Sequence, residues 1–169
     1  MSPQIILVTG TPGTGKTVLA RALGKKLNAR VVNEKSFCQK MKCATFDPKT
    51  KEWEIDLKKY KKAFTAFVKQ HKGKNIILEG HVGCEVKLPV SHAVLLRCNP
   101  TELGYRLAQR HYSELKIQEN MFCEQTNYVG NHLRTHFARI PKLEISTDSD
   151  SPAKITLSIA KWLRSHPND

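Results

Sequence analysis

The feature that most constrains the fold is an eight-residue stretch near the start of the chain. Residues 10–17 read Gly-Thr-Pro-Gly-Thr-Gly-Lys-Thr, which matches the pattern G-x-x-x-x-G-K-[ST] of a phosphate-binding loop. A short run of branched apolar residues at 4–8 comes before it and predicts a buried strand. After it, residues 17–28 repeat leucine and alanine at helical spacing. A strand, a glycine-rich turn and a helix in this order predict a loop that wraps around phosphate groups.

Each residue type in this loop suits a nucleotide. The glycines let the backbone turn tightly and bring its N–H groups against phosphate oxygens, and the following helix directs its positive end to the same place. The ammonium of Lys16 can reach the β- and γ-phosphates, and the hydroxyl of Thr17 can coordinate Mg²⁺. We therefore assign nucleotide binding to a set of loop residues: Gly10, Gly13, Thr14, Gly15, Lys16, Thr17 and Val18.

Length and cysteine content place the chain in a broad class. Its 169 residues are enough for one domain with its own core. No apolar run approaches the ~20 residues that a membrane-spanning helix needs. Five cysteines, an odd number without a C-x-x-C pair, are typical of reduced thiols rather than of disulfides or a zinc site. We expect an intracellular protein, in the cytoplasm or, in a eukaryote, also in the nucleus.

The net charge of +13 is unevenly spread along the chain. Residues 35–74 hold twelve lysines and four acidic residues, which gives this segment a net charge of +8. Such a field attracts polyanions, for which nucleotides, RNA and ribonucleoproteins are the candidates. A solvated lysine-rich surface without a partner explains the same pattern equally well.

Apolar runs and helical patterns alternate through the chain. They predict a doubly wound, five-stranded parallel sheet with helices on both faces. The predicted strands are 4–8, 30–33, 75–79, 92–98 and 143–146. The predicted helices are 17–28, 56–71, 99–108, a long helix after Ser113, and 151–163. Residues 34–60 fit neither pattern, and we expect them to form an inserted subdomain.

Three further segments are more specific than the phosphate loop. They read Glu-Gly-His at 79–81, Arg-Leu-Ala-Gln-Arg-His-Tyr-Ser-Glu at 106–114 and Lys-Ile-Gln-Glu-Asn at 116–120. Together with the loop, they resemble the adenylate kinase isoenzyme 6 family, and more its archaeal than its eukaryotic branch. The resemblance covers nearly the whole chain, and it is strong in 4–33 and 75–123 and weak in 34–60 and after 125.

The resemblance implies the nucleoside monophosphate kinase fold in one domain, 1–169. Its core would be 1–32, 63–108 and 121–169, with an insertion that binds the nucleoside monophosphate (NMP) at about 33–62 and a short lid at about 109–120. It also implies Mg²⁺ and ATP as donor, AMP or another monophosphate as acceptor, and ATPase activity. The family is reported to act in late maturation of the small ribosomal subunit and its 16S–18S rRNA, with ribosomal protein uS11 as partner.

The same resemblance suggests roles for four residues, of which Glu79 and His81 lie at a predicted strand end, where ligands of such sheets bind, and Arg106 and Arg110 lie at the entry to the lid. Glu79 would hold Mg²⁺ through water, and His81 would place the attacking water or sense the γ-phosphate. Arg110 would contact the nucleotide, with Arg106 four residues earlier on the same helix face. The alternatives are an acid that caps a turn, a structural histidine and a pair of surface arginines.

Departures from the family pattern bear on the acceptor. Val18 stands where a second hydroxyl residue is common, and His111 replaces the usual glycine after Arg110. The segment 33–62 contains no arginine, so the acceptor phosphate would be held by lysines, which lack bidentate geometry, unless Arg97 or Arg134 supplies the contact.

Two other functions stay open. One is a kinase of another small metabolite, and the other is a ribosome-assembly factor that uses ATP as a conformational switch.

Overall fold

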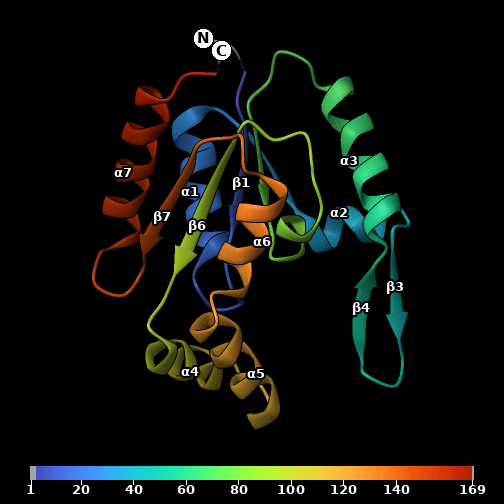
Figure 1. Cartoon of the computed structure of the whole chain (residues 1–169), viewed down its shortest axis with the longest axis vertical. Coiled ribbons are helices and arrows are strands. Elements are labelled where there is room, and N and C mark those ends of the chain that lie inside the picture. Colours follow the sequence, from blue (N-terminus) through green and yellow to red (C-terminus); the bar gives the residue numbers. More distant parts are fainter. Residues whose placement is uncertain (1–2, 169) are drawn as a thin grey trace.

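A five-stranded parallel sheet lies at the centre of the computed structural model, which describes residues 3–168 (Figure 1). Its strand order is β2-β5-β1-β6-β7. The strands are β1 (Ile5–Thr9), β2 (Arg30–Asn33), β5 (Ile76–Glu79), β6 (His92–Arg97) and β7 (Lys142–Ser146). The predicted fold class and all five predicted strands are confirmed, and the ends of the predicted domain, 1–2 and 169, lie outside the described residues.

Helices cover both faces of the sheet (Figure 1). One face packs against α1 (Lys16–Leu27) and α7 (Pro152–Ser165), where Leu23 and Ile159 are fully buried. The other face packs against α2 (Glu34–Lys40), α3 (Leu57–Gln70) and α6 (Tyr128–His136). Strand residues alternate between these two cores because successive side chains of a strand point to opposite faces.

Helix α3 shows how local sequence sets this arrangement. The Asp56 carboxylate caps its first turn by accepting the backbone N–H groups of Lys58 and Lys59, both at 3.0 Å. Tyr60 and Phe64, one turn apart, are buried in the core, while the lysines between them point to solvent. The helix predicted from Asp56 onwards is therefore confirmed.

The structure defines one segment that the sequence pattern left open and corrects the length of a helix in another. Residues 34–60 begin with the short helix α2 and continue as a separate antiparallel hairpin of β3 (Ala44–Asp47) and β4 (Glu52–Ile55). The helix expected after Ser113 is confirmed with Ser113 as its cap, but it is shorter than predicted. Helix α5 (Glu114–Gln125) is followed by the separate helix α6, and Asn127 at the junction has a left-handed φ of 52° that an α-helix cannot continue through.

The carboxyl ends of the strands meet at one edge of the sheet. Helices α4 (Pro100–Gln109) and α5 lie beyond this edge, and the β3–β4 hairpin extends to the same side (Figure 1). The turn after β5 is a 3-10 helix, η1 (Val82–Glu85). Across residues 3–168, none of the helices has the length and apolarity that crossing a membrane requires.

Candidate active site

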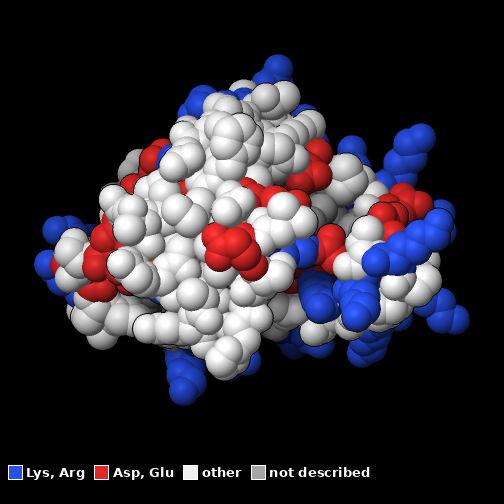
Figure 2. Space-filling view, turned by 90° about the horizontal axis from the view of Figure 1, so that it is seen from below, with Lys and Arg blue, Asp and Glu red and all other residues white. Residues whose placement is uncertain are grey.

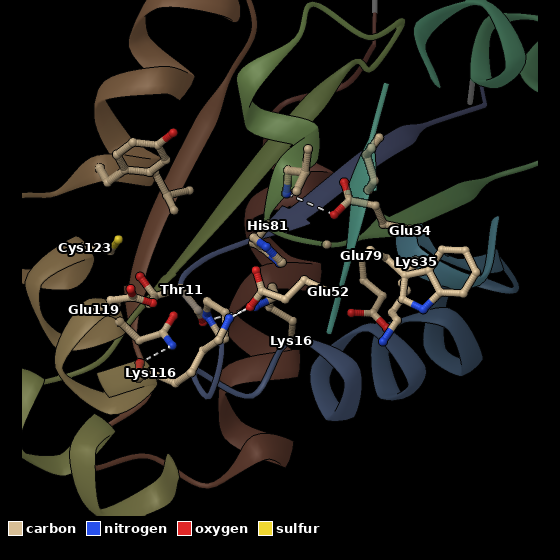
Figure 3. Close-up of a pocket in the computed structure, with 18 of the residues that line it drawn as sticks. Thr11, Lys16, Glu34, Lys35, Glu52, Glu79, His81, Lys116, Glu119 and Cys123 are labelled. Atoms are coloured by element: carbon tan, nitrogen blue, oxygen red, sulfur yellow. Dashed lines mark hydrogen bonds and ion pairs between the residues drawn. The ribbon is translucent and has the colours of Figure 1, made fainter. Parts of the chain in front are cut away.

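A cleft of about 820 Å³ opens at this edge of the sheet. Its walls come from the phosphate loop, the ends of β2 and β5, the β3–β4 hairpin and helix α5 (Figure 3). Lys16, Glu79 and His81, which lie far apart in the sequence, all line it. The parallel topology brings them together because each follows the carboxyl end of a strand.

The phosphate loop is held in shape by its backbone and by α4. Gly13 has a φ of 93°, and a Cβ added there would lie 2.9 Å from the side chains of Leu103 and Leu107. The buried Thr14 hydroxyl donates to the Thr11 carbonyl at 2.8 Å, which closes the turn. The N-terminus of α1 therefore opens into the cleft, and this arrangement of helix end and N–H groups favours an anion.

Lys16 lies within this loop rather than in solvent. Its Nζ donates to the carbonyl oxygens of Gly10 at 2.8 Å and Thr11 at 3.1 Å. Burial lowers its pKa to about 8, and the nearby carboxylates of Glu79 and Glu34 oppose this shift. The ammonium is thus close to its titration point in the ligand-free protein, and the negative charge of a bound phosphate would stabilise it.

Glu79 and Thr17 bring two oxygen ligands for a metal ion close together. The buried Glu79 carboxylate accepts the Thr17 hydroxyl at 3.2 and 3.3 Å and the Asn33 side-chain amide at 2.6 Å. Thr17 itself is exposed to solvent. A hydroxyl and a carboxylate that converge beside a phosphate loop are the oxygen ligands that Mg²⁺ prefers, so these residues fit the ion.

His81 faces the same cleft from the turn after β5. The residue is exposed, yet the protein that partly surrounds it, with the positive charge of Lys16 nearby, lowers its pKa to about 4. The imidazole is therefore neutral around pH 7, with one N–H donor and one lone pair. A group of this kind can orient a water molecule without carrying charge.

The two predicted arginines have different surroundings. Arg110, exposed at the end of α4, is close enough to Lys16 for its positive charge to lower the Lys16 pKa. Arg106 donates to Glu102 at 2.9 Å and to the Thr147 hydroxyl and carbonyl at 3.1 and 2.9 Å, and it does not line the cleft. Its interactions bind α4 to the loop after β7, and a nucleotide role for it stays a prediction.

Neither arginine suggested as an acceptor clamp lines the cleft. Arg97 donates to Glu124, Asn127 and Glu144, so its guanidinium is committed to a network at the end of β6. Arg134 donates to a side chain of its own helix. The lysines of 33–62 that line the cleft are Lys35 and Lys51. On the opposite wall, Lys116 forms an ion pair with Glu52 across the mouth (Figure 3).

Val18 and His111, the two residues here that depart from the family pattern, differ from the usual residues in side chain and in backbone conformation. Val18 is 54% exposed and has an apolar side chain where a hydroxyl would offer a phosphate contact. His111 adopts a φ of 58°, the left-handed region that suits glycine, although histidine tolerates it better than most residues.

Sequence reasoning missed two buried acids of the site. Glu124 accepts the Thr11 hydroxyl and Arg97 Nε, both at 2.6 Å, and so anchors the phosphate loop to α5. Nothing in its local sequence sets it apart from a surface acid. Glu34 lines the cleft and is 3% exposed. It follows the end of β2 directly, and the strand-end rule that selected Glu79 would have selected it too.

Comparison with known proteins identifies the family of the chain. A family model described as "AAA domain" matches residues 6–127. A protein of Pyrococcus furiosus named "Putative adenylate kinase" is 32% identical over 163 residues, which is 96% of this chain and 85% of the relative. A protein of the same name from Sulfurisphaera tokodaii is 30% identical over 160 residues, 92% of this chain and 80% of that one.

Solved structures show the same fold at low sequence identity. The shikimate kinase of Acinetobacter baumannii, solved with shikimate, has a TM-score of 0.65 at 12% identity and covers 99% of this chain and 96% of its own. A gluconokinase of Sinorhizobium meliloti has a TM-score of 0.62 at 12% identity, with 97% and 94% covered. Because the family model spans most of the chain and the Pyrococcus relative matches nearly all of it, the chain belongs to the family of these archaeal adenylate kinase homologues, P-loop proteins of the kinase fold.

Proposed function

We propose that the protein transfers the γ-phosphoryl group of ATP to a nucleoside monophosphate and, in competition, to water. The observation that carries this proposal is the convergence of Lys16, Glu79 and His81 on one cleft of about 820 Å³, with the Thr17 hydroxyl hydrogen-bonded to Glu79. The relatives named adenylate kinase support the nucleotide class of substrate. The NMP-binding insertion at 33–62 and the lid at 109–120 are part of the same proposal.

Each residue has a physical task in this reaction. The ammonium of Lys16 leaves the carbonyls of Gly10 and Thr11 to neutralise charge on the β- and γ-phosphates. Thr17 and Glu79 would hold Mg²⁺, which would neutralise negative charge on the phosphates. Arg110 lies at the lid, where a guanidinium meets the transferring group. His81 orients the water that competes with the acceptor.

The residues that would hold the acceptor phosphate predict weak and permissive monophosphate kinase activity, with ATP hydrolysis as a large share of the total turnover. Lys35 and Lys51 offer point charges to the acceptor phosphate, without the bidentate grip of an arginine. Orientation supplies up to ~7–11 kcal/mol of a well-aligned bimolecular reaction. Looser orientation therefore costs more in transfer to AMP than in transfer to water, which needs no grip on an acceptor phosphate.

Product analysis with ATP, with and without AMP, tests this proposal. Steady-state assays should show substantial phosphate release without AMP and ADP formation with several monophosphates. Replacing Lys35 or Lys51 by alanine should raise the KM for the monophosphate, whereas Lys25→Ala, on the exposed far end of α1, should not. Efficient, AMP-selective ADP formation with negligible hydrolysis would contradict the argument. Activity confined to another metabolite would favour the metabolite kinase.

A second candidate function, ATP-switched binding to a ribosomal particle, is favoured by the charge of the surface. Lysines gather on the side of the molecule that carries the β3–β4 hairpin (Figure 2). On α3, Lys58, Lys59, Lys61 and Lys62 are exposed, and of these the described part of the chain pairs only Lys59 with an acid, Asp56 at 3.9 Å. By family resemblance, the partners would be rRNA and ribosomal protein uS11.

RNA binding through this face would depend steeply on salt. If single-stranded RNA engages Z phosphates, log K falls with log salt at a slope of roughly −0.7Z. Replacing the four α3 lysines by serine should flatten the slope measured by filter binding. The matched control replaces Lys25, Lys26, Lys154 and Lys161, four exposed lysines on α1 and α7. Equal slopes in both variants would mean that the α3 lysines form only a solvated surface.

A further inference from the structure

Glu34 is a buried carboxylate whose direct hydrogen bonds come from uncharged groups. Its Oε1 accepts the Tyr60 hydroxyl at 3.0 Å, and its Oε2 accepts the Val82 backbone N–H at 3.0 Å. Burial raises the pKa of this carboxyl, and hydrogen-bonding interactions with Val82, Tyr60 and the Gly83 backbone, together with the positive charge of Lys16, oppose the shift. An ionisable side chain placed in such surroundings calls for an explanation, because an apolar residue would fill the space at lower cost.

The turn that carries His81 closes around this carboxylate. A Cβ added at Gly80 would lie 2.3 Å from the Glu34 carboxylate, and one at Gly83 would lie 3.0 Å from its Oε1. The carboxylate thus contacts the backbone on both sides of His81, at Gly80 before it and at Val82 after it (Figure 3). Any side chain larger than a hydrogen atom at Gly80 would push the Glu34 carboxylate away from the turn.

The His81 ring depends on this backbone for its position. Within residues 3–168 its imidazole forms no hydrogen bond, and only its carbonyl is engaged, as acceptor for the Cys84 thiol at 3.1 Å. Its orientation is therefore set by the φ and ψ angles of the turn. Glu34 holds that turn from α2, the helix that also carries Lys35 on the acceptor side of the cleft.

We propose that Glu34 is a positioning residue that fixes the His81 turn through the Val82 N–H, and so sets the rate of transfer to water. The inference rests on the proposed ATPase activity and on the part of His81 in it. The essential property of Glu34 is the reach of its side chain rather than its charge. Tyr60 supports the other oxygen, and within residues 3–168 its hydroxyl forms a hydrogen bond with Glu34 but none with the turn itself.

Two substitutions separate reach from charge. Glu34→Asp keeps the charge but shortens the side chain by one carbon, so it withdraws from the Val82 N–H, and ATPase kcat should fall about 10- to 100-fold, the range for a catalytic group misplaced by ~1 Å. Glu34→Gln removes the charge but keeps an oxygen at the same reach, and it should restore most of the activity lost in the aspartate variant. The opposite ranking would overturn the proposal and assign Glu34 an electrostatic role toward Lys16.

A double-mutant cycle with His81 gives the second criterion. Glu34→Asp in a His81→Ala background should cost less than about 2-fold further, because coupled residues are not additive. Tyr60→Phe, which leaves the Val82 hydrogen bond intact, is the matched control and should change the ATPase less than about 2-fold, as expected of a group that only supports the carboxylate. Multiplicative losses for Glu34 and His81 would contradict the proposal.

A spectroscopic readout separates this inference from the proposed function. In ¹H–¹³C spectra of the full chain, assigned by comparison with His81→Ala, the His81 ring signal should shift in Glu34→Asp and stay in place in Glu34→Gln and Tyr60→Phe. If the wild-type protein turns over no ATP, the proposed function fails, but the ¹H–¹³C comparison still tests the contact between Glu34 and the His81 turn. An unmoved His81 signal in Glu34→Asp would overturn the inference even in an active enzyme.

Discussion

Replacing Lys16 by alanine is expected to lower ATP turnover by ~10³-fold, the upper end of what removal of one donor at a developing charge costs. The ammonium lies inside the phosphate loop and is held by the Gly10 and Thr11 carbonyls, so it is positioned before a nucleotide arrives. Its removal takes charge stabilisation from the β- and γ-phosphates and leaves the apolar core unchanged. Steady-state phosphate release and ADP formation should fall together.

The control for this variant lies on the same helix. Lys25→Ala removes an equal charge from the last turn of α1, about 14 Å along the axis at 1.5 Å per residue. It should keep wild-type turnover, and both variants should unfold within a few degrees of the wild type. Wild-type turnover in Lys16→Ala would rule out catalysis by the phosphate loop.

The depressed pKa of Lys16 adds a pH signature to the same prediction. Burial lowers this pKa from 10.5 to about 8 in the free protein, so the ammonium loses its proton as the pH rises through this value. The attraction for ATP is present below about pH 8 and is lost above it. Because kcat/KM reports the free enzyme, kcat/KM for ATP should fall above pH 8 while kcat changes less. A flat kcat/KM up to pH 9.5 would contradict the assignment.

Replacing His81 by alanine is expected to depress the ATPase by about 10²-fold, the low end for a positioned acid–base group, and the AMP kinase far less. Water has no binding determinants of its own, whereas AMP is also held by its phosphate and base. The loss of an orienting ring therefore affects hydrolysis more. Both activities, measured on one preparation, give the ratio that checks this result.

The pH dependence of the wild-type ATPase completes this test. Burial and Lys16 lower the His81 pKa to about 4, so the ring stays neutral from pH 8 down to pH 5 and gains a proton only below that. The His81-dependent part of the ATPase should therefore be level over this range. His132→Ala, on α6 outside the cleft, is the matched control. Equal losses of hydrolysis and phosphotransfer in His81→Ala would assign the ring to a step that both share.

The sequence by itself determined the sheet, the phosphate loop and the edge at which the site lies. The three central strands, β1, β5 and β6, are short apolar runs bounded by polar residues, so the sequence pattern identifies them without knowledge of their neighbours. Caps such as Asp56 and Ser113 mark helix starts because they act on backbone groups two or three residues away. Since strand ends gather at one edge, the local pattern also indicated that Glu79 and His81 lie beside Lys16.

Only the tertiary structure decided which side chains meet. Helix α2 has seven residues, too few for a helical period to show, and it exists because Phe37 and Cys38 pack into the core. Arg97 is withdrawn from the cleft by Glu124, and Glu34 is bound by Tyr60 and Val82. These partners lie 26 to 48 residues apart along the chain. Local propensity acts over a few residues, whereas such contacts depend on how whole elements pack, and so packing determined the inner lining of the site.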